Sequence, residues 1–256
     1  MSWDPDFTTR NPILGQLSDL IRFQQPRWPD VACLNKQLAT QLPVCFIDDQ
    51  HFAALDCYYE EAVARGQVPT RQANWHDFFG AVIWHLFPHT KALLNRLHME
   101  HIAVHGARRR TPRRDRITHF DECGLVLAVR EGDEAAALLQ AHDWQTLFVT
   151  GRTHWQQRRA FVFGHALYEL ALAPFIGLTA KAVVITMPDA FFEAPVHRQY
   201  QLLDSALCAH LEQQQLFDKP KPLRPLPLLG IPGWWPANEN PAFYNNTDYF
   251  RPRRQG

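Results

Sequence analysis

The chain lacks several features that would identify its class at once. Lysine plus arginine equals aspartate plus glutamate over its 256 residues, so the net charge of zero indicates neither nucleic acid nor a membrane as a partner. An uninterrupted apolar run of about 18 residues, the minimum for a transmembrane helix, does not occur. The N-terminus has no basic region followed by an apolar stretch. We therefore expect neither a transmembrane helix nor a secretory signal, and no membrane partner.

Cysteine is also sparse. The five cysteines are odd in number, widely spaced and without a Cys-x-x-Cys pair. This pattern argues against a disulfide framework and against a cysteine zinc site. Free thiols are typical of a reducing compartment, so we expect a cytoplasmic protein.

The motifs that name a reaction are missing. The chain contains no Walker loop, no GxGxxG, no GxSxG and no HExxH. Their absence argues against a P-loop NTPase, a dinucleotide enzyme, an α/β-hydrolase and a zincin. Internal repeats and Gly/Ser linkers are also missing, which favours one continuous domain.

The composition is that of a globular protein, with 46% hydrophobic and 20% charged residues. We expect a single domain over 1–256, because the chain is long enough for one substantial core. Residues 1–45 are punctuated by proline and are predicted to wrap around it. Residues 219–256 are rich in proline and aromatics and are predicted to pack on the body in extended form.

The clearest predicted element is a helix over Trp75–Phe87, whose apolar residues recur every three or four positions. Asn74 is a suitable N-cap and Pro88 should end the helix. Around it we predict a mainly helical α+β fold with a small mixed sheet. The other expected helices cover 52–65, 90–105, 133–142, 152–172 and 196–215, and the expected strands cover 117–120, 125–129, 146–149 and 182–187. The first two strands should form a hairpin that turns at Gly124.

Three short segments each place a histidine beside an acid: Asn74-Trp75-His76-Asp77, Thr118-His119-Phe120-Asp121-Glu122, and Gly164-His165 followed by Glu169. Imidazole and carboxylate together serve metal ligation and acid–base chemistry. Each segment also has a structural interpretation, as a helix cap, a turn and a buried core pair respectively. Gly164, expected in mid-helix, would allow another segment to approach closely.

If the three segments converge, they predict one catalytic site. Its candidate catalytic residues are His76, Asp77, Asp121, Glu122, His165 and Glu169. His76, Asp121 and His165 are the candidate ligands of a divalent metal, for which zinc, manganese and iron suit mixed nitrogen and oxygen donors. His76 and His165 could alternatively carry protons, with Asp121 or Glu122 as general base.

Six arginines lie within residues 108–116, which read as a polar loop. Guanidinium groups bind phosphates well, so Arg109, Arg110, Arg113 and Arg114 are candidates for holding an anionic substrate, either a small molecule or nucleic acid. A solvated basic loop is the structural alternative.

Several stretches resemble a bacterial family known as domain of unknown function 3025. They include Asn74-Trp-His-Asp-Phe-Phe79, Phe120-Asp-Glu-Cys-Gly124, Phe163-Gly-His-Ala-Leu-Tyr-Glu169 and Leu229-Gly-Ile-Pro-Gly-Trp-Trp-Pro-Ala-Asn238. The similarity runs from about residue 50 to Pro252. It implies a bacterial cytoplasmic protein and carries no reaction or functional residue with it.

Two hypotheses follow for function. The first is a metal-assisted or acid–base hydrolase that acts on an anionic substrate. The second is a noncatalytic module that binds nucleic acid or a protein through the arginine segment and Trp234-Trp235, with the histidine–acid clusters purely structural.

Overall fold

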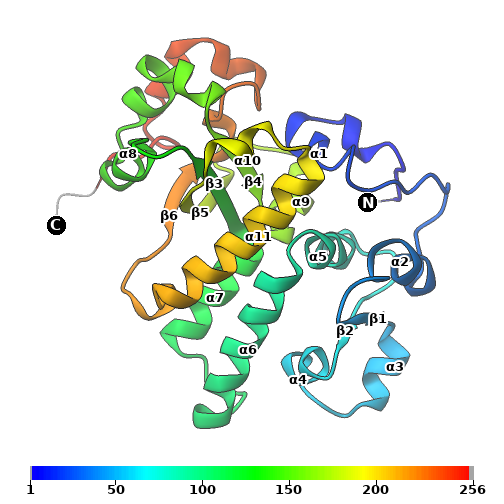
Figure 1. The fold of residues 1–256 in the computed structure, drawn as a ribbon. Coiled ribbons are helices and arrows are strands. Elements are labelled where there is room, and N and C mark those ends of the chain that lie inside the picture. The colour runs from blue at the N-terminus through cyan, green and yellow to red at the C-terminus, as the bar shows by residue number, and fades with distance from the viewer. Residues whose placement is uncertain (1, 254–256) are drawn as a thin grey trace.

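The fold is mainly helical with two small β-sheets, and the computed structural model describes residues 2–253 (Figure 1). The larger sheet consists of β3 (Gly124–Val129), β4 (Arg159–Val162), β5 (Thr179–Thr186) and β6 (Arg224–Pro227). Its strand order is β4-β3-β5-β6. The two inner strands are parallel and each edge strand is antiparallel to its neighbour. The predicted α+β class with a small mixed sheet is therefore confirmed.

A second sheet pairs β1 (Cys45–Ile47) with β2 (Gln67–Pro69) in parallel. Two short helices, α3 (Asp49–Ala54) and α4 (Tyr59–Ala64), connect these strands. The single helix predicted over 52–65 is therefore wrong. The chain adopts a left-handed φ of +45° at Asp56, which separates the two helices.

Two consecutive helices follow the small two-stranded sheet in the chain: α5 (Trp75–Leu86) and α6 (Pro88–His105). As predicted, Asn74 caps α5 through its side-chain oxygen, which accepts from the backbone N–H of Asp77. Pro88 ends α5 and is also the first residue of α6, a position where its missing N–H costs nothing. The helix predicted over 90–105 therefore begins two residues earlier than expected, and it ends at Gly106, which has a φ of +77°.

The predicted hairpin around Gly124 is wrong. Residues Pro112–Cys123 form the helix α7, which leads directly into β3. Thr111 caps this helix, and Ile117 and Phe120, three positions apart, bury the same helical face. Gly124 has a φ of −69° and makes no turn. Asp121 and Glu122 consequently lie in the last turn of a helix.

The long helix predicted over 152–172 is also wrong. The chain forms a 3-10 helix (Arg152–Gln156), then β4, then the short helix α9 (His165–Ala171). Pairing of β4 with β3 overrides the local periodicity, because it satisfies backbone groups along a fully buried strand. Residues 146–149, predicted as a strand, lie instead in a single π-helical turn, Thr146–Thr150.

Two other predicted elements are confirmed. The apolar run over 182–187 belongs to β5, and the last long helix is α11 (Val196–Gln213), which contacts β5 and crosses in front of the sheet in Figure 1. The remaining helices are η1 (Phe7–Thr9), α1 (Pro12–Gly15), α2 (Val31–Leu38), α8 (Ala135–Ala141), α10 (Asp189–Glu193), η4 (Leu216–Asp218), η5 (Leu228–Gly230), η6 (Pro236–Glu239) and η7 (Pro241–Asn245). Within residues 2–253, no helix has the length and apolarity to cross a membrane.

The C-terminal segment is fixed by buried hydrogen bonds, both within itself and to Leu178, the residue before β5. The Asn238 side-chain amide donates to the carbonyls of Leu229 and Ile231. The Tyr249 hydroxyl donates to the carbonyl of Leu178 and accepts from the N–H of Leu229. These contacts give the aromatic-rich segment a fixed place without long helices of its own.

Candidate metal centre

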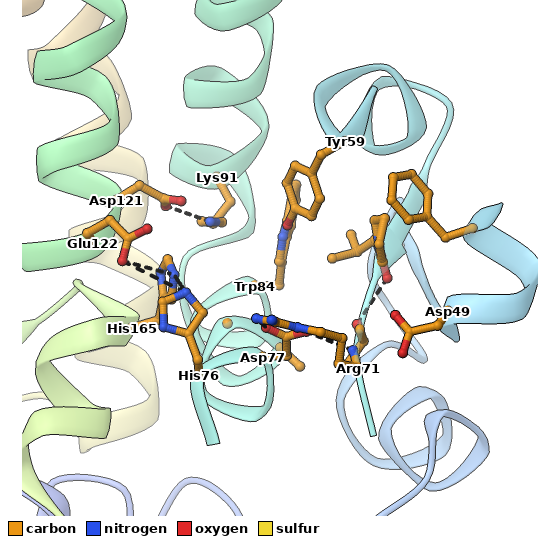
Figure 2. A pocket seen from close by; sticks show the side chains of 16 residues that line it. Asp49, Tyr59, Arg71, His76, Asp77, Trp84, Lys91, Asp121, Glu122 and His165 are labelled. Carbon is orange, nitrogen blue, oxygen red and sulfur yellow. Dashed lines mark hydrogen bonds and ion pairs between the residues drawn. The ribbon is translucent and has the colours of Figure 1, made fainter. Parts of the chain in front are cut away.

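Three side chains from three different helices bring their ligand atoms together (Figure 2). His76 lies in the first turn of α5, Glu122 in the last turn of α7, and His165 at the start of α9. The two imidazole Nε2 atoms are 3.0 Å apart, and Glu122 Oε2 lies 3.8 Å from that of His76 and 3.6 Å from that of His165. Within residues 2–253, this is the group of histidine and acid side chains that could hold a metal ion.

Gly164 makes this convergence possible. A Cβ atom built on Gly164 would lie 2.3 Å from the carbonyl oxygen of Glu122 and 2.6 Å from the Cα of Cys123. Only glycine therefore lets the start of α9 lie directly on the end of α7. Gly164 occupies the N-cap of α9 and not a mid-helix position, but the close approach that we predicted at this residue is present.

Glu169 orients the first imidazole. His76 Nδ1 lies 2.9 Å from Glu169 Oε2, so the ring donates its Nδ1–H to the carboxylate. The Nε2 atom then carries the lone pair and faces His165 and Glu122. Metal-binding histidines in proteins commonly donate their other ring N–H to a carboxylate in this way.

His165 is held in the neutral form. Burial lowers its pKa to about 4, against the opposing influence of Asp121. Nδ1 of His165 is buried and has no hydrogen-bond partner of good geometry within the described residues. The backbone of Asp121 lies close to the ring and raises the pKa of His165, but burial outweighs this effect. A neutral imidazole is the form that ligates metals.

The distances fit a small cation. Zinc–ligand bonds of about 2.0–2.1 Å in a tetrahedron separate the ligand atoms by about 3.3 Å. The observed separations, 3.0, 3.6 and 3.8 Å, bracket that value. Two nitrogen lone pairs facing each other at 3.0 Å repel unless a proton or a cation lies between them.

Asp121 has a different partner from the one that we predicted. Its carboxylate accepts a 2.5 Å hydrogen bond from Lys91 Nζ, and the Lys91 side chain is only 8% exposed. Burial by itself would raise the pKa of Asp121, but Lys91 and His165 lower it. The carboxylate that joins the two imidazoles is accordingly Glu122, whose pKa is raised by burial and lowered by His76, with a net rise.

A cavity of about 300 Å³ opens in front of the three ligand atoms. We call it the metal-side cavity. It is lined by His76, Glu122, His165, Asp121, Lys91, Tyr59, Trp84, Gly80, Ala81, Asp77, Arg71, Thr70, Pro69, Val68, Phe52 and Asp49. The carboxylate of Asp77 is bound by the Arg71 guanidinium at 2.8 and 2.9 Å, so it does not reach back to complete a capping box with Asn74.

The structure thus brings His76, Asp77, Asp121, Glu122 and His165 to one cavity. Glu169 lies behind His76 and acts through it. Sequence reasoning assigned no role to Lys91, Tyr59 or Arg71. The sequence gives no sign that Lys91 is buried. Lysine is rarely buried without a partner, and the partner of Lys91, Asp121, lies on another helix.

The four candidate substrate-binding arginines lie away from the metal-side cavity. Arg114 is buried and pairs with Glu60 at 2.7 Å, and Arg113 pairs with Asp218 at 3.1 Å. Arg110 pairs with Asp115 at 3.0 Å. The carbonyl of Arg109 accepts from Arg114. Residues 108–116 are predicted to form a loop, but from Pro112 onward they form the start of α7.

Trp234 and Trp235, the other half of the binding-module hypothesis, are partly buried against the core. Their burial leaves less ring surface for a partner than an exposed pair would offer.

Comparison with known families supports the resemblance seen in the sequence. The family described as "Protein of unknown function (DUF3025)" matches residues 44–254, which is most of the chain. The chain belongs to this family. No curated protein and no solved structure matches it. Because the family's description assigns no function, the function has to be argued from the site.

Proposed function

We propose that the protein is a metal-dependent hydrolase whose centre is formed by His76, Glu122 and His165. The observation that carries the proposal is the meeting of two imidazole Nε2 atoms and one carboxylate oxygen, 3.0–3.8 Å apart, at the wall of a 300 Å³ cavity. Catalytic zinc sites use three protein ligands and leave the fourth position to water, and two histidines with one glutamate form one such combination.

The charge around the metal-side cavity supports a bound cation. Four carboxylates line it, from Asp49, Asp77, Asp121 and Glu122, against the two permanent cations of Arg71 and Lys91. A divalent ion would balance this excess. It would also take the place of a proton between the two Nε2 atoms and hold Glu122 ionised, since a nearby positive charge favours a carboxylate.

The bound metal would supply a water of lowered pKa and an electrophile for the substrate oxygen. The chain's own residues would do the rest. Glu169 holds the tautomer of His76, and Asp121 binds the Lys91 ammonium group at the cavity wall. Beyond its bond to Asp121, the Lys91 ammonium group keeps further N–H donors, which can hydrogen-bond the substrate oxygen on which negative charge develops.

Tyr59 offers a further hydrogen-bond donor. Almost half of its surface is exposed, but burial of its hydroxyl end, together with the charge of Asp121, raises the pKa of that hydroxyl. Tyr59 therefore stays protonated and can donate to a bound substrate. We propose that an anionic reacting group is met by the metal and Lys91 and not by the arginines at 109–114.

We propose zinc, manganese or iron as the metal, because all three accept mixed imidazole and carboxylate ligands. Zinc is the first to test, since the two-histidine, one-glutamate combination is found in zinc hydrolases. Within residues 2–253 the five cysteines are all free, which supports our further proposal that the protein works in the cytoplasm.

The test begins with metal content. Protein stripped with chelator is dialysed separately against zinc, manganese and ferrous iron, and bound metal is measured by mass spectrometry. We expect about one zinc per chain, by analogy with other three-ligand sites. His165→Ala and Glu122→Ala should abolish it, whereas His105→Ala, which removes an exposed histidine elsewhere on α6, should not. Zinc that persists in the His165 and Glu122 variants would refute the site.

The second step tests hydrolysis. Metal-free and zinc-loaded protein are compared on a panel of chromogenic esters, amides and phosphate esters. We expect turnover in the zinc-loaded form alone, and its loss in Lys91→Met, which keeps the length of the side chain without its charge. A zinc-loaded protein that hydrolyses no member of a broad panel would argue against the hydrolase.

A further inference from the structure

A second cavity of about 210 Å³ adjoins the metal-side cavity. We call it the distal cavity. The two cavities share five lining side chains, those of Tyr59, Trp84, Lys91, Asp121 and Glu122. The distal cavity adds Glu60, Val63, Leu94, Asn95, His98, Arg110 and Thr118, which come from α4, α6, α7 and the segment before α7. Figure 2 shows Lys91 and Asp121, two of the shared side chains, joined by their hydrogen bond next to Glu122 and His165.

Size argues that a substrate uses both cavities. Small-molecule sites commonly occupy about 300–1,000 Å³. The metal-side cavity alone lies at the lower end of that range, and part of it would be taken by the metal and its water. A substrate with more than a few atoms beyond its reacting bond therefore extends past the Lys91–Asp121 pair.

The charges of the distal cavity are already neutralised by protein groups. Glu60 is paired with the buried Arg114 at 2.7 Å, and Arg110 with Asp115 at 3.0 Å. Lys91 and Asp121 pair with each other, and Glu122 belongs to the metal centre. An ionic group entering this cavity would lose its hydration without gaining a free counter-charge, which is costly.

The groups that remain are uncharged. Asn95 donates one bond to the carbonyl of Glu60, and the Thr118 hydroxyl accepts one from Arg110, which leaves each with further hydrogen-bonding capacity. His98 is neutral, because burial lowers its pKa to about 4. Val63 and Leu94 supply apolar wall.

We propose that the distal cavity is a subsite for an uncharged, hydrogen-bonding part of the substrate, such as an amide or a hydroxylated group. The proposal rests on the proposed metal-dependent function, because the reacting bond would lie at the metal centre while this part extends beyond Lys91 and Asp121. The substrate would then be an elongated molecule with its anionic or carbonyl-type reacting group at one end and a neutral polar group at the other.

Hydroxamates test this proposal because they chelate zinc and can carry an arm. Acetohydroxamate probes the metal centre alone. Three longer hydroxamates with identical arms end in a primary amide, a carboxylate or an ammonium group. Binding of each to the zinc-loaded protein is measured by calorimetry. We expect the amide arm to lower the Kd at least tenfold relative to acetohydroxamate, and the two charged ends to lose most of that gain.

Thr118→Phe fills the distal cavity and leaves every proposed metal ligand in place. Its matched control is His119→Phe, at the neighbouring exposed position of α7, which lines neither cavity. We expect Thr118→Phe to remove the gain from the amide arm and to leave the Kd of acetohydroxamate within about twofold, since Thr118 does not line the metal-side cavity. His119→Phe should change neither Kd.

The outcomes separate the two proposals. If acetohydroxamate fails to bind the zinc-loaded protein, the metal centre is wrong and the subsite falls with it. If acetohydroxamate binds but the amide arm adds nothing, the subsite is overturned while the metal centre stands. A carboxylate or ammonium arm that matches the amide arm, or a gain that survives Thr118→Phe, overturns it equally.

Discussion

The contact between Glu169 and His76 gives the sharpest prediction about the site. Glu169 is not itself a ligand of the metal centre, but its Oε2 atom holds the Nδ1–H of His76 at 2.9 Å. Removal of a carboxylate that orients a metal-binding histidine typically weakens metal binding 10- to 100-fold, or about 1.4–2.7 kcal/mol. Glu169→Ala should therefore weaken zinc binding by that factor.

The size of the effect can be divided between the hydrogen bond and the charge. Glu169→Gln keeps an oxygen that accepts from Nδ1 and removes only the negative charge. The Glu169 side chain is 41% exposed, so its charge is screened by solvent. Exposed ion pairs contribute about 0.2–1 kcal/mol, which corresponds to a loss of at most about fivefold in Glu169→Gln. Zinc binding should therefore weaken in the order wild type, Gln variant, Ala variant.

Competition with a fluorescent zinc chelator gives the three dissociation constants. Glu131→Ala removes an exposed carboxylate in the turn after β3 and serves as the control for loss of surface charge. The unfolding free energy of each metal-free variant is compared by urea titration, to separate loss of the site from loss of the fold. If Glu169→Ala binds zinc within threefold of the wild type, the contact does not prepare His76 as a ligand.

Three further predictions concern the framework that holds the site. Asp204→Asn should cost roughly 2–4 kcal/mol, because the 1%-exposed carboxylate accepts from the backbone N–H groups of both His89 and Thr90 at the start of α6; a loss under about 0.5 kcal/mol in urea would contradict this. Gly80→Ala should stabilise α5 by about 0.5–1 kcal/mol, since no atom lies within 4 Å of the added Cβ, and a lower urea midpoint would show that this space is needed. The pKa of His98 is about 4 in the folded protein, where burial lowers it, and about 6.5 in the unfolded chain, so only the unfolded chain takes up its proton between these limits and the unfolding free energy falls by up to about 3 kcal/mol as the pH drops. His98→Gln should flatten that slope in urea titrations from pH 7 to pH 4, and an unchanged slope would show that His98 is not buried in the neutral form.

Helices with a clear apolar period could be predicted from the sequence because the period itself determines which face is buried. The helix from Trp75 shows this: Phe78, Phe79 and Val82 share a face and are all buried. The local cap at Asn74 was equally readable, since it involves residues only three positions apart.

Elements decided by distant partners could not be predicted in this way. Residues 159–162 fit a helical pattern, but they pair with β3, more than 30 positions earlier in the chain. Asp121 and Glu122 looked like turn residues because Gly124 follows them, yet that glycine is needed for another reason. A Cβ on it would lie 2.4 Å from the carbonyl of Phe120, at the sharp change from α7 to β3.

The same distinction applies to the site. The histidine–acid segments pointed to the right parts of the chain, but which carboxylate faces which imidazole depends on helix ends that lie far apart in the sequence. Lys91 takes Asp121 as its partner, and Glu122, one position later and about 100° further around the helix, is left to face His76 and His165. No local pattern distinguishes two adjacent acids in this way.

The structural alternative for the three clusters explains part of what is observed. Asn74 does cap α5, and His76 does form an ordinary hydrogen bond with Glu169. It does not explain His165. A histidine kept only for packing would be expected to satisfy its ring nitrogens, yet its buried Nδ1 has no acceptable partner within residues 2–253 and its Nε2 faces another imidazole nitrogen at 3.0 Å. The unpartnered Nδ1 lowers stability, whereas the two Nε2 atoms are within hydrogen-bond distance when one of them carries a proton. A cation between His165, His76 and Glu122 would replace that proton, engage all three ligand atoms and use the cavity in front of them, which favours a metal centre over a core pair.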